Sequence, residues 1–327
     1  MKEKERDRSG DGAGPVAPRK KKPCLGLLCG IIMLQSFLFL PHSTCAQRGE
    51  PTHLRGLSLI VDVGVLNASD VQANFYNGAP TNVNTLQRIL YSESYGPNIW
   101  NNLTEQDLIG SAVSNYNQIT VAEYGEMYYK LAFQLGLGFR YDLEPRGGYR
   151  NGNWAWQLRF DYAKLHAQGM VLLNSGKNQS ILSNQNAYVD CPTSGLEERI
   201  YIDLGLLRRF KLRNGMDLEA AAGVSAMNTK VESSDIMIAG VTYSILDVWA
   251  GQSPSSYTGS YEYVNQGGIG VGGYASLALG FTLPAGTAMS LGYTFYYNKV
   301  NLEGYTSFEP HHAVKLNVAL NNFSLFD

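Results

Sequence analysis

Apolar or aromatic residues occupy every second position of the segment from Met127 to Asp142, and polar or small residues occupy the positions between them. A period of two is typical of a β-strand and excludes a helical stripe. Strands of soluble proteins usually run about 5–6 residues, whereas this alternation continues for sixteen. Ten residues at a rise of about 3.3 Å, tilted by about 45°, span about 25 Å, the height of the apolar band of a transmembrane β-barrel. The segment is therefore predicted to be a membrane strand whose apolar face contacts lipid.

The same alternation recurs along the chain and predicts eight strands. They are Leu57–Ser69, Met127–Asp142, Trp154–Leu165, Arg199–Lys211, Met216–Met227, Gly268–Leu283, Ala288–Lys299 and His312–Phe323. Long and short connections alternate, and the short ones include the hairpin signal Arg213-Asn214-Gly215. Bacterial barrels have an even number of strands, short periplasmic turns and long external loops. We therefore predict an all-β, transmembrane, antiparallel up-and-down barrel with both termini in the periplasm.

Four external loops follow from this arrangement, at about residues 70–124, 167–196, 230–266 and 300–310. The first is expected to be partly helical, because apolar residues between 83 and 90 recur at helical spacing after Asn82, and a second short helix is expected over Thr104–Ala112. A segment of this length buries little core unaided, so we expect a long loop and no separate soluble domain.

The N-terminus has the pattern of a secretory signal peptide. A basic run from Arg19 to Lys22 precedes an apolar segment from Leu25 to Leu40, which is short for a membrane-spanning helix. We expect cleavage after Ala46, which leaves residues 47–327 as the barrel. The alternatives are an uncleaved signal anchor and a lipoprotein signal through Cys45, which lacks the apolar residue expected three positions earlier.

Composition narrows the class of protein further once this leader is removed. The remaining chain has 18 basic and 24 acidic residues, a net charge of −6, so no nucleic-acid footprint remains. Three of the four cysteines lie in the leader, which leaves Cys191 alone and excludes an intrachain disulfide or a cysteine metal site. No second long apolar run is present, which excludes a helical membrane protein but not a barrel.

From Leu57 onward the sequence resembles the small eight-stranded outer-membrane barrels of Gram-negative bacteria, the class that includes the OmpA transmembrane domain, OmpX and OmpW. The resemblance lies in the strand pattern and implies an architecture and a bacterial outer-membrane location rather than an activity. The Ala46-Gln47 junction and the Asn- and Tyr-rich composition resemble barrels of the Bacteroidota. The end of the chain departs from the class, because Asp327 follows Phe326 where a terminal aromatic residue is usual.

The polar faces of the predicted strands carry a set of charged and amide side chains that should point into the lumen. An eight-stranded barrel is just wide enough for side chains to fill it, and charges buried there must be paired. One interpretation is a salt-bridged core that holds the barrel shut, and the alternative is a narrow proton- or ion-conducting path. The set comprises Asp62, Lys130, Gln134, Arg140, Asp142, Arg159, Asp161, Asp203, Glu219 and Lys315.

Some barrels are enzymes, which makes the histidines candidate catalytic groups. Nucleophilic catalysis needs a histidine beside a serine and oriented by a carboxylate. His166, His311 and His312 are expected near the outer rim, with Ser307 and Glu309 close to the last two in sequence. No motif pairs them, and adjacent strand residues such as His311 and His312 point to opposite faces, which disfavours a metal site.

A phosphate-binding motif and a cofactor are not expected either. The glycine-rich segment from Gly267 to Gly273 lies in a predicted membrane strand with no helix after it, so its glycines are expected to relieve crowding inside the barrel.

Aromatic residues surrounded by Asn, Ser and Gly mark the external loops as candidate contact surfaces. Such a composition forms protein contacts, although the same residues could pack the loops onto one another. The candidates are Phe75, Tyr76, Tyr95, Trp100, Tyr257 and Tyr261. The leading hypothesis is a non-catalytic structural or interaction protein whose partners are outer-membrane lipids and other outer-membrane or surface proteins, for example as an accessory subunit of a larger complex. A narrow porin-like channel and a rim hydrolase using His166 or His311 are the alternatives.

Overall fold

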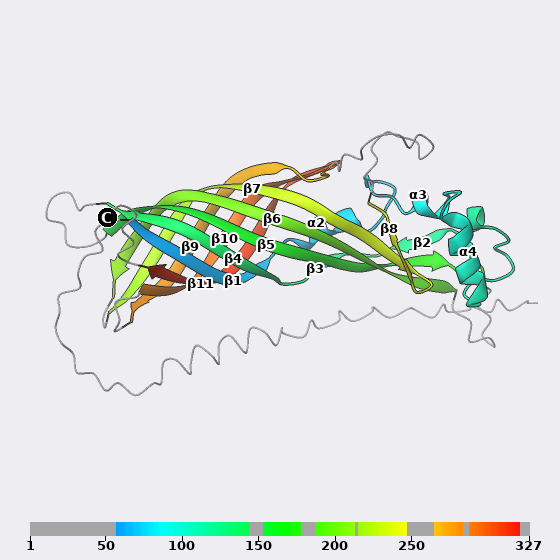
Figure 1. Cartoon of the computed structure of the whole chain (residues 1–327), viewed down its shortest axis with the longest axis horizontal. Coiled ribbons are helices and arrows are strands. Elements are labelled where there is room, and N and C mark those ends of the chain that lie inside the picture. Colours follow the sequence, from blue (N-terminus) through cyan, green and yellow to red (C-terminus); the bar gives the residue numbers. More distant parts are fainter. Residues whose placement is uncertain are drawn as a thin grey trace, which may run out of the picture. The chain divides into compact units, whose positions relative to one another are not determined.

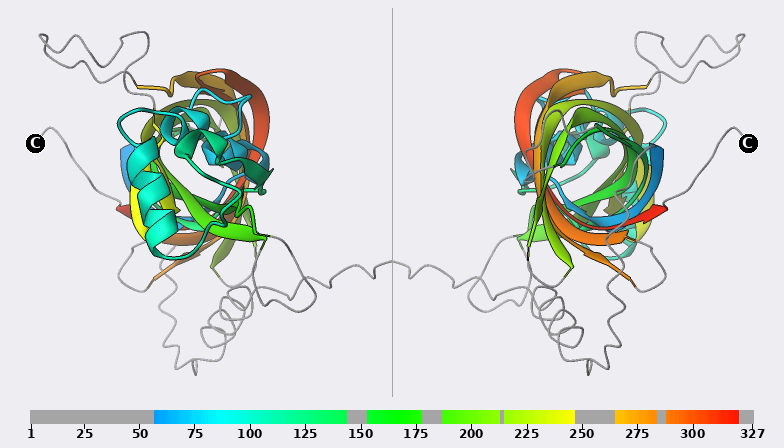
Figure 2. Two further views of the ribbon diagram at one scale, coloured as in Figure 1. Left: turned by 90° about the vertical axis from the view of Figure 1, so that its right-hand side faces the viewer. Right: turned by 90° about the vertical axis from the view of Figure 1, so that its left-hand side faces the viewer.

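Eight antiparallel strands form a closed ring in the computed structural model, which describes residues 57–143, 153–177, 187–212, 215–246, 265–283 and 288–320. Each of these eight strands pairs with the next of the eight along the chain, and the first of them pairs with the last. The ring is seen end-on in Figure 2. In order around it, the strands are β1 (Leu57–Asn67), β4 (Ala132–Asp142), β5 (Asn153–Asn174), β6 (Tyr188–Lys211), β7 (Met216–Ile238), β9 (Ile269–Thr282), β10 (Ala288–Leu302) and β11 (Tyr305–Leu320). The predicted eight-stranded, up-and-down β-barrel is confirmed.

The outward face of β6 shows where a bilayer fits this ring. Leu206, Leu204, Ile202 and Ile200 are exposed between the charged residues Arg208 and Glu198. Ten residue steps at about 3.3 Å, tilted by about 40°, span about 25 Å, which equals the apolar band of a transmembrane barrel. Exposed aromatic residues flank the band on neighbouring strands, with Tyr141, Trp154 and Trp156 on one side and Tyr162 and Tyr297 on the other. The outward positions predicted from the period of two therefore face lipid.

A charged belt closes one side of this band. It consists of Lys164, Glu198, Lys230 and Glu232, which form ion pairs across the outer surface of β5, β6 and β7. Side chains this exposed stabilise a protein by less than about 1 kcal/mol per pair. These residues mark the level at which the outer surface of the barrel changes from apolar to polar.

Strands β5, β6 and β7 continue far beyond this belt, which corrects the described parts of the predicted loops at 167–196 and 230–266. β5 and β6 stay paired from Asn153↔Arg209 to Asn174↔Tyr188, and β6 and β7 from Lys211↔Asp217 to Thr193↔Ile236. After a turn at Ala239 and Gly240, β8 (Val241–Ser244) pairs back onto β7. The predicted loop at 300–310 is also paired strand, since β10 and β11 meet in a tight turn at Gly304. The outward residues of these segments are polar, as in loops, and this explains the wrong prediction. Every second side chain is nevertheless buried, as in a strand.

The segment Met127–Asp142 is two strands rather than one, namely β3 (Tyr128–Tyr129) and β4. The alternation changes phase at Lys130 and Leu131, which are both exposed. Met127 and Tyr129 therefore point inward, and Lys130 does not enter the lumen as predicted. The cause lies in the preceding segment, because the Asn74 and Asp70 side chains accept hydrogen bonds from the backbone N–H groups of Met127 and Tyr129.

The segment between β1 and β3 is partly helical, as predicted. It contains α2 (Asp70–Ala73), η1 (Asn74–Tyr76), α3 (Gln87–Leu90), α4 (Gly96–Glu105), η2 (Tyr116–Gln118) and β2 (Val121–Tyr124). The helix expected over Thr104–Ala112 is wrong, because α4 starts at Gly96 with Pro97 in its first turn and ends at Glu105, two residues before Asp107 adopts a positive φ of 51°. Proline fixes φ where a helix begins, and a left-handed residue ends one.

A second hydrophobic core lies beyond the charged belt. Leu86, Leu90, Ile99 and Leu103 from the helical segment are fully buried against apolar side chains of β5, β6, β7 and the chain after β8. Figure 1 shows α3, α4, β2 and β8 gathered at one end of the long strands. We call these elements, together with the ends of β5, β6 and β7 beyond the belt, the outer module. The helical segment could bury little core by itself. It forms part of a hydrophobic core here because the extended strands supply the other half.

No helix in the described ranges is long and apolar enough to cross a bilayer. The predicted signal peptide, the hairpin residues Arg213 and Asn214, the end of the last predicted strand, and the loop residues Tyr257 and Tyr261 lie outside the described residues.

Candidate functional site

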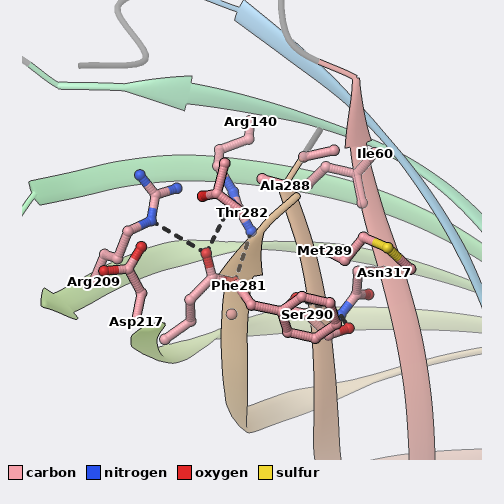
Figure 3. A pocket seen from close by; sticks show the side chains of 13 residues that line it. Ile60, Arg140, Arg209, Asp217, Phe281, Thr282, Ala288, Met289, Ser290 and Asn317 are labelled. Carbon is pink, nitrogen blue, oxygen red and sulfur yellow. Dashed lines mark hydrogen bonds and ion pairs between the residues drawn. The ribbon is translucent and has the colours of Figure 1, made fainter. Parts of the chain in front are cut away.

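The lumen is filled by three successive layers of polar side chains, which can be followed along the inward face of β6. The first contains Arg140, whose two terminal nitrogens donate to the two carboxylate oxygens of Glu219 at 3.0 and 3.1 Å. Arg209 Nε donates to the same carboxylate at 3.2 Å, and the Asp142 carboxylate lies 3.9 Å from Arg209. Figure 3 shows Arg140, at the top, and Arg209, at the left, reaching toward the same point.

The second layer lies in the middle of the membrane band. Arg159 donates to Asp62 at 2.8 Å and to Asn317 at 2.7 Å. Lys315 Nζ donates to Asp161 at 2.6 Å and to the Tyr296 hydroxyl at 2.8 Å. The strand between Asp62 and Asp161 carries Gly136, where a Cβ would lie 2.1 Å from Asp161 Oδ1 and 2.4 Å from Asp62 Oδ1.

Tyr296 connects this layer to a third carboxylate. The Tyr296 hydroxyl donates to Asp203 at 3.1 Å. Three carboxylates and two cations therefore share the layer, and each cation contacts at least one carboxylate or its hydrogen-bonded tyrosine. Removing one partner from such a buried network leaves an uncompensated charge, which is far costlier than losing a surface pair.

The third layer is centred on Glu197 and Arg199, two positions apart on β6 and both completely buried. Arg199 Nε donates to Glu197 at 2.6 Å, and Arg199 Nη1 lies 3.2 Å from His311 Nδ1. The other carboxylate oxygen of Glu197 accepts from the Tyr129 hydroxyl at 3.0 Å. This layer lies at the level of the charged belt, because Glu198 of the belt is its neighbour on the outward face.

The segment Asp70–Tyr76, which we call the plug, closes the lumen above this layer. Tyr76 donates its hydroxyl to Glu197 at 2.7 Å, and the Gln72 side-chain oxygen accepts from Arg199 at 2.7 Å. Tyr76 is fully buried and Phe75 nearly so, with their rings edge to face at 5.1 Å. Gly195 makes room, since a Cβ there would lie 2.2 Å from the Tyr76 ring. The plug is thus anchored by hydrogen bonds to a buried ion pair and by ring packing.

Small cavities lie inside the ring beside the first layer. Two cavities of about 40 and 20 Å³ lie beside the first layer, lined among others by Arg140, Glu219 and Asn317. Figure 3 shows the larger of them, with Ser290 and Asn317 on the side opposite Arg209. A void of this size holds one or two water molecules. Neither cavity offers a path for a small solute.

The structure places nine of the ten predicted lumen residues inside the ring and brings most of them into the first two layers. Gln134 is fully buried there as well, and Lys130 is the exception described above. Sequence reasoning missed the third layer and Arg209. A signal was available, because continuing the alternation of β6 backward from Ile200 places Arg199 and Glu197 on the inward face. The strand predicted over Arg199–Lys211 begins two residues after Glu197 and so leaves that residue outside the predicted barrel.

The histidines do not form a catalytic arrangement. His311 is buried at the third layer beside Arg199 rather than on the rim, and His166 is exposed on β5. His312 stacks on Tyr293 on the outward face, with ring centroids 6.0 Å apart. Within the described ranges, none of these three side chains has a serine partner among the hydrogen bonds, and no group of three potential metal ligands is found.

The candidate loop contacts divide into two groups. Phe75 and Tyr76 belong to the plug and are not available to a partner, which corrects the prediction. Trp100 is half-buried in the second core and donates to the Val113 carbonyl at 3.4 Å. Tyr95 remains 51% exposed and packs edge to face against Tyr243. Only Tyr95 of these four is free to serve as a surface contact.

The glycine-rich segment behaves as expected from its place in a strand. It leads into β9, and a Cβ on Gly270 would lie 1.6 Å from the Lys299 carbonyl oxygen of β10. Close approach of two backbones explains this glycine without any phosphate.

The eight-stranded antiparallel ring is the architecture that the strand pattern indicated. Solved structures similar to it include neisserial surface protein A, with 9% identity over 81% of this chain and 97% of that one and a TM-score of 0.36. Ail of Yersinia pestis has 9% identity, the same two coverages and a TM-score of 0.29, and OprG of Pseudomonas aeruginosa has 10% identity over 82% and 95%, with 0.31. No family model and no curated protein sequence matches the chain. These likenesses concern the fold alone.

Proposed function

We propose that this protein is a sealed, non-catalytic β-barrel of the bacterial outer membrane that holds an interaction module at the cell surface. The observation that carries the proposal is the second hydrophobic core, which stands beyond the charged belt and outside the apolar band. A barrel that only filled the membrane would need about ten residues per strand, whereas β5, β6 and β7 have 22, 24 and 23. The additional residues of these three strands form part of the outer module.

The position of the chain ends in the ring supports one orientation in the membrane. β1 begins and β11 ends at the same end of the barrel, because Leu59 pairs with Leu320, and the module lies at the other. A chain delivered from the periplasm keeps its termini on that side. The module is therefore expected outside the cell, where it meets other envelope or surface proteins.

The channel hypothesis has less support. Three polar layers and the plug occupy the lumen, and its cavities beside the first layer are of water size. A rim hydrolase has less support still, because His311 is enclosed and His166 stands alone on the surface.

Two measurements test the proposal together. The intact protein and a variant in which residues 78–119 are replaced by a Gly-Ser linker are used as bait in outer membranes extracted with mild detergent. The linker variant keeps the plug and the barrel, so it is a matched control for the membrane part. A stoichiometric partner that is captured only by the intact protein supports the proposal, and equal behaviour of the two baits contradicts it.

Conductance in planar bilayers separates the channel from the sealed anchor. We expect no steady current for the intact protein at voltages that open porins. A stable ohmic conductance would reject the sealed barrel and restore the channel hypothesis.

A further inference from the structure

The outer module contains a groove that forms where β6 and β7 separate. Their pairing ends at Thr193↔Ile236, and the next residue of β6 is Pro192. Proline has no N–H and cannot continue a ladder. β7 then turns at Ala239 and Gly240, whose φ values of 50° and 78° suit a two-residue hairpin, and pairs with β8 instead. Among the described residues, the stretch Tyr188–Pro192 pairs with β5 on one side and with no strand on the other.

The groove has a volume of about 530 Å³, within the range of about 300–1,000 Å³ usual for ligand sites. The open edge of β6 forms one wall, the turn from Met237 to Gly240 forms the other, and residues 106–108 after α4 close it. These parts are tied together, because the Gln106 side-chain nitrogen donates to the Ala239 carbonyl at 2.8 Å. A site held in this way loses little freedom when a ligand binds.

The chemistry of the walls combines a strand edge with acidic and apolar side chains. Asp190 is exposed, and Asp107 is 88% exposed at its side chain. The one cation in the lining, Lys177, is only 11% exposed and lies 3.2 Å from Asp107. Met237 and Tyr188 are exposed at 40% and 48%. The groove therefore offers backbone hydrogen-bonding groups, apolar contacts and a net negative charge.

The geometry points to this groove as a binding site for an extended peptide segment that carries a basic residue, added as a strand to the open edge of β6. Strand addition takes its affinity from main-chain hydrogen bonds and its specificity from alternate side chains. The backbone of Tyr188–Pro192 supplies the main-chain hydrogen bonds. Asp190 and Met237 contact the alternate side chains of the peptide. This inference rests on the proposed function, since it names the class of partner that the outer module receives.

Other ligands fit the groove less well. An anionic glycan or phosphate group would face Asp107 and Asp190, while Lys177 is already paired. A neutral sugar could stack on Tyr188 but would leave the strand edge without a matching ladder. A peptide backbone satisfies that edge and the carboxylates together.

The test uses the intact protein in zwitterionic detergent and a fluorescein-labelled hexapeptide, Val-Lys-Val-Lys-Val-Thr, titrated by fluorescence anisotropy. Two matched peptides serve as controls. One has the same sequence with N-methyl groups on alternate residues, which removes ladder donors, and the other has Glu in place of Lys. Saturable binding of the parent peptide and at least about tenfold weaker binding of both controls is expected.

Charge reversal on the protein locates the site. Asp190→Lys should weaken the parent peptide by about tenfold or more, since like charges would meet. Asp235→Lys, the same change on the neighbouring β7 outside the groove, is the control and should leave binding unchanged. Asp190 is exposed, so its substitution is compatible with folding, which the heat-modified mobility of the barrel verifies.

Three results would overturn the inference: no saturable binding, equal binding of the N-methylated peptide, or displacement of the peptide by maltohexaose. These outcomes are independent of the proposed function, because partner capture from outer membranes uses the natural partner and the whole module. A captured partner without peptide binding rejects the groove alone.

Discussion

The lumen and the outer module are built on opposite principles although the same three strands run through both. Inside the ring, β6 presents Arg209, Asp203, Arg199 and Glu197, and the interior is held by charge pairs. Further along the same inward face, the strand presents Cys191 and Val189 to an apolar core. Lipid surrounds the first part on its outer side, so its apolar residues face outward and leave the polar ones inside. Water surrounds the second part, and the arrangement reverses.

The difference predicts how each part fails. A buried charge network is costly to break at one point, because the remaining partner stays buried and unpaired. An apolar core loses stability in proportion to the volume removed. Substitutions in the two regions should therefore differ in how much stability they cost and in how far from the substituted residue the structure is disturbed.

The largest effect is expected from Arg199→Met. It leaves the fully buried Glu197 carboxylate without its cation and removes the anchors of Gln72 and His311. We expect a loss of about 3–5 kcal/mol in the free energy of unfolding, measured by denaturant titration in detergent. Lys230→Met in the charged belt is the control and should cost less than about 1 kcal/mol. Equal losses in the two variants would contradict the special status of the third layer.

Leu103→Ala should destabilise the outer module without opening the barrel. Leu103 is fully buried in the second core, and such truncations cost about 2–5 kcal/mol. Accelerated maleimide labelling of Cys191, which is buried in the same core, reports module opening, and heat-modified mobility reports the barrel. If barrel and module are lost together, the two cores are one cooperative unit and the comparison fails.

Tyr76→Phe should loosen the plug by about 1–3 kcal/mol, because one hydrogen bond to a buried carboxylate is removed while the ring remains. Faster amide hydrogen exchange over Gln72–Tyr76 is the expected sign. Tyr95→Phe, on the exposed surface of the module, should leave this exchange unchanged. Unchanged exchange in both variants would mean that ring packing alone holds the plug.

The smallest effect is expected from pH. Burial raises the pKa of the Cys191 thiol to about 12, whereas an unfolded thiol has a pKa of about 8.5. The folded module thus keeps a proton that the unfolded chain loses, so its stability is full below about pH 8.5 and falls as pH rises toward 12. At pH 10 the loss should be about 1–2 kcal/mol, measured by the unfolding of the module in urea. Cys191→Ala should reduce this pH dependence, and the remainder belongs to Tyr124 beside the same core, whose pKa is also raised by burial.

The membrane band could be predicted from the sequence because lipid imposes one rule on every outward position. Val61, Leu137, Ile202 and Leu279 all follow from a period of two. The strand extensions could not, since water replaces lipid there and outward residues such as Ser194 and Asp190 resemble those of a loop. The phase change at Lys130 depends on hydrogen bonds from a segment about 60 residues earlier, which no local pattern contains.

The candidate site was predictable in part for the same reason. Asp62, Arg159 and Lys315 lie opposite lipid-facing residues, so the alternation assigns them to the lumen. The plug carries no such mark, because Gln72 and Tyr76 lie in a short polar stretch that is typical of exposed loops. Their burial depends on Glu197 and Arg199, and these positions are recognised only when the full length of β6 is known.

The pairing of β1 with β11 places the plug beside the seam of the ring. The first and last strands meet only after the whole chain has been delivered, and His311 of β11 reaches Arg199 in that same step. The plug follows β1 by two residues, so it is already at the open seam when the ring shuts. In the folded ring, the β1–β11 seam, the plug and the Glu197–Arg199 pair are therefore joined by one continuous set of contacts.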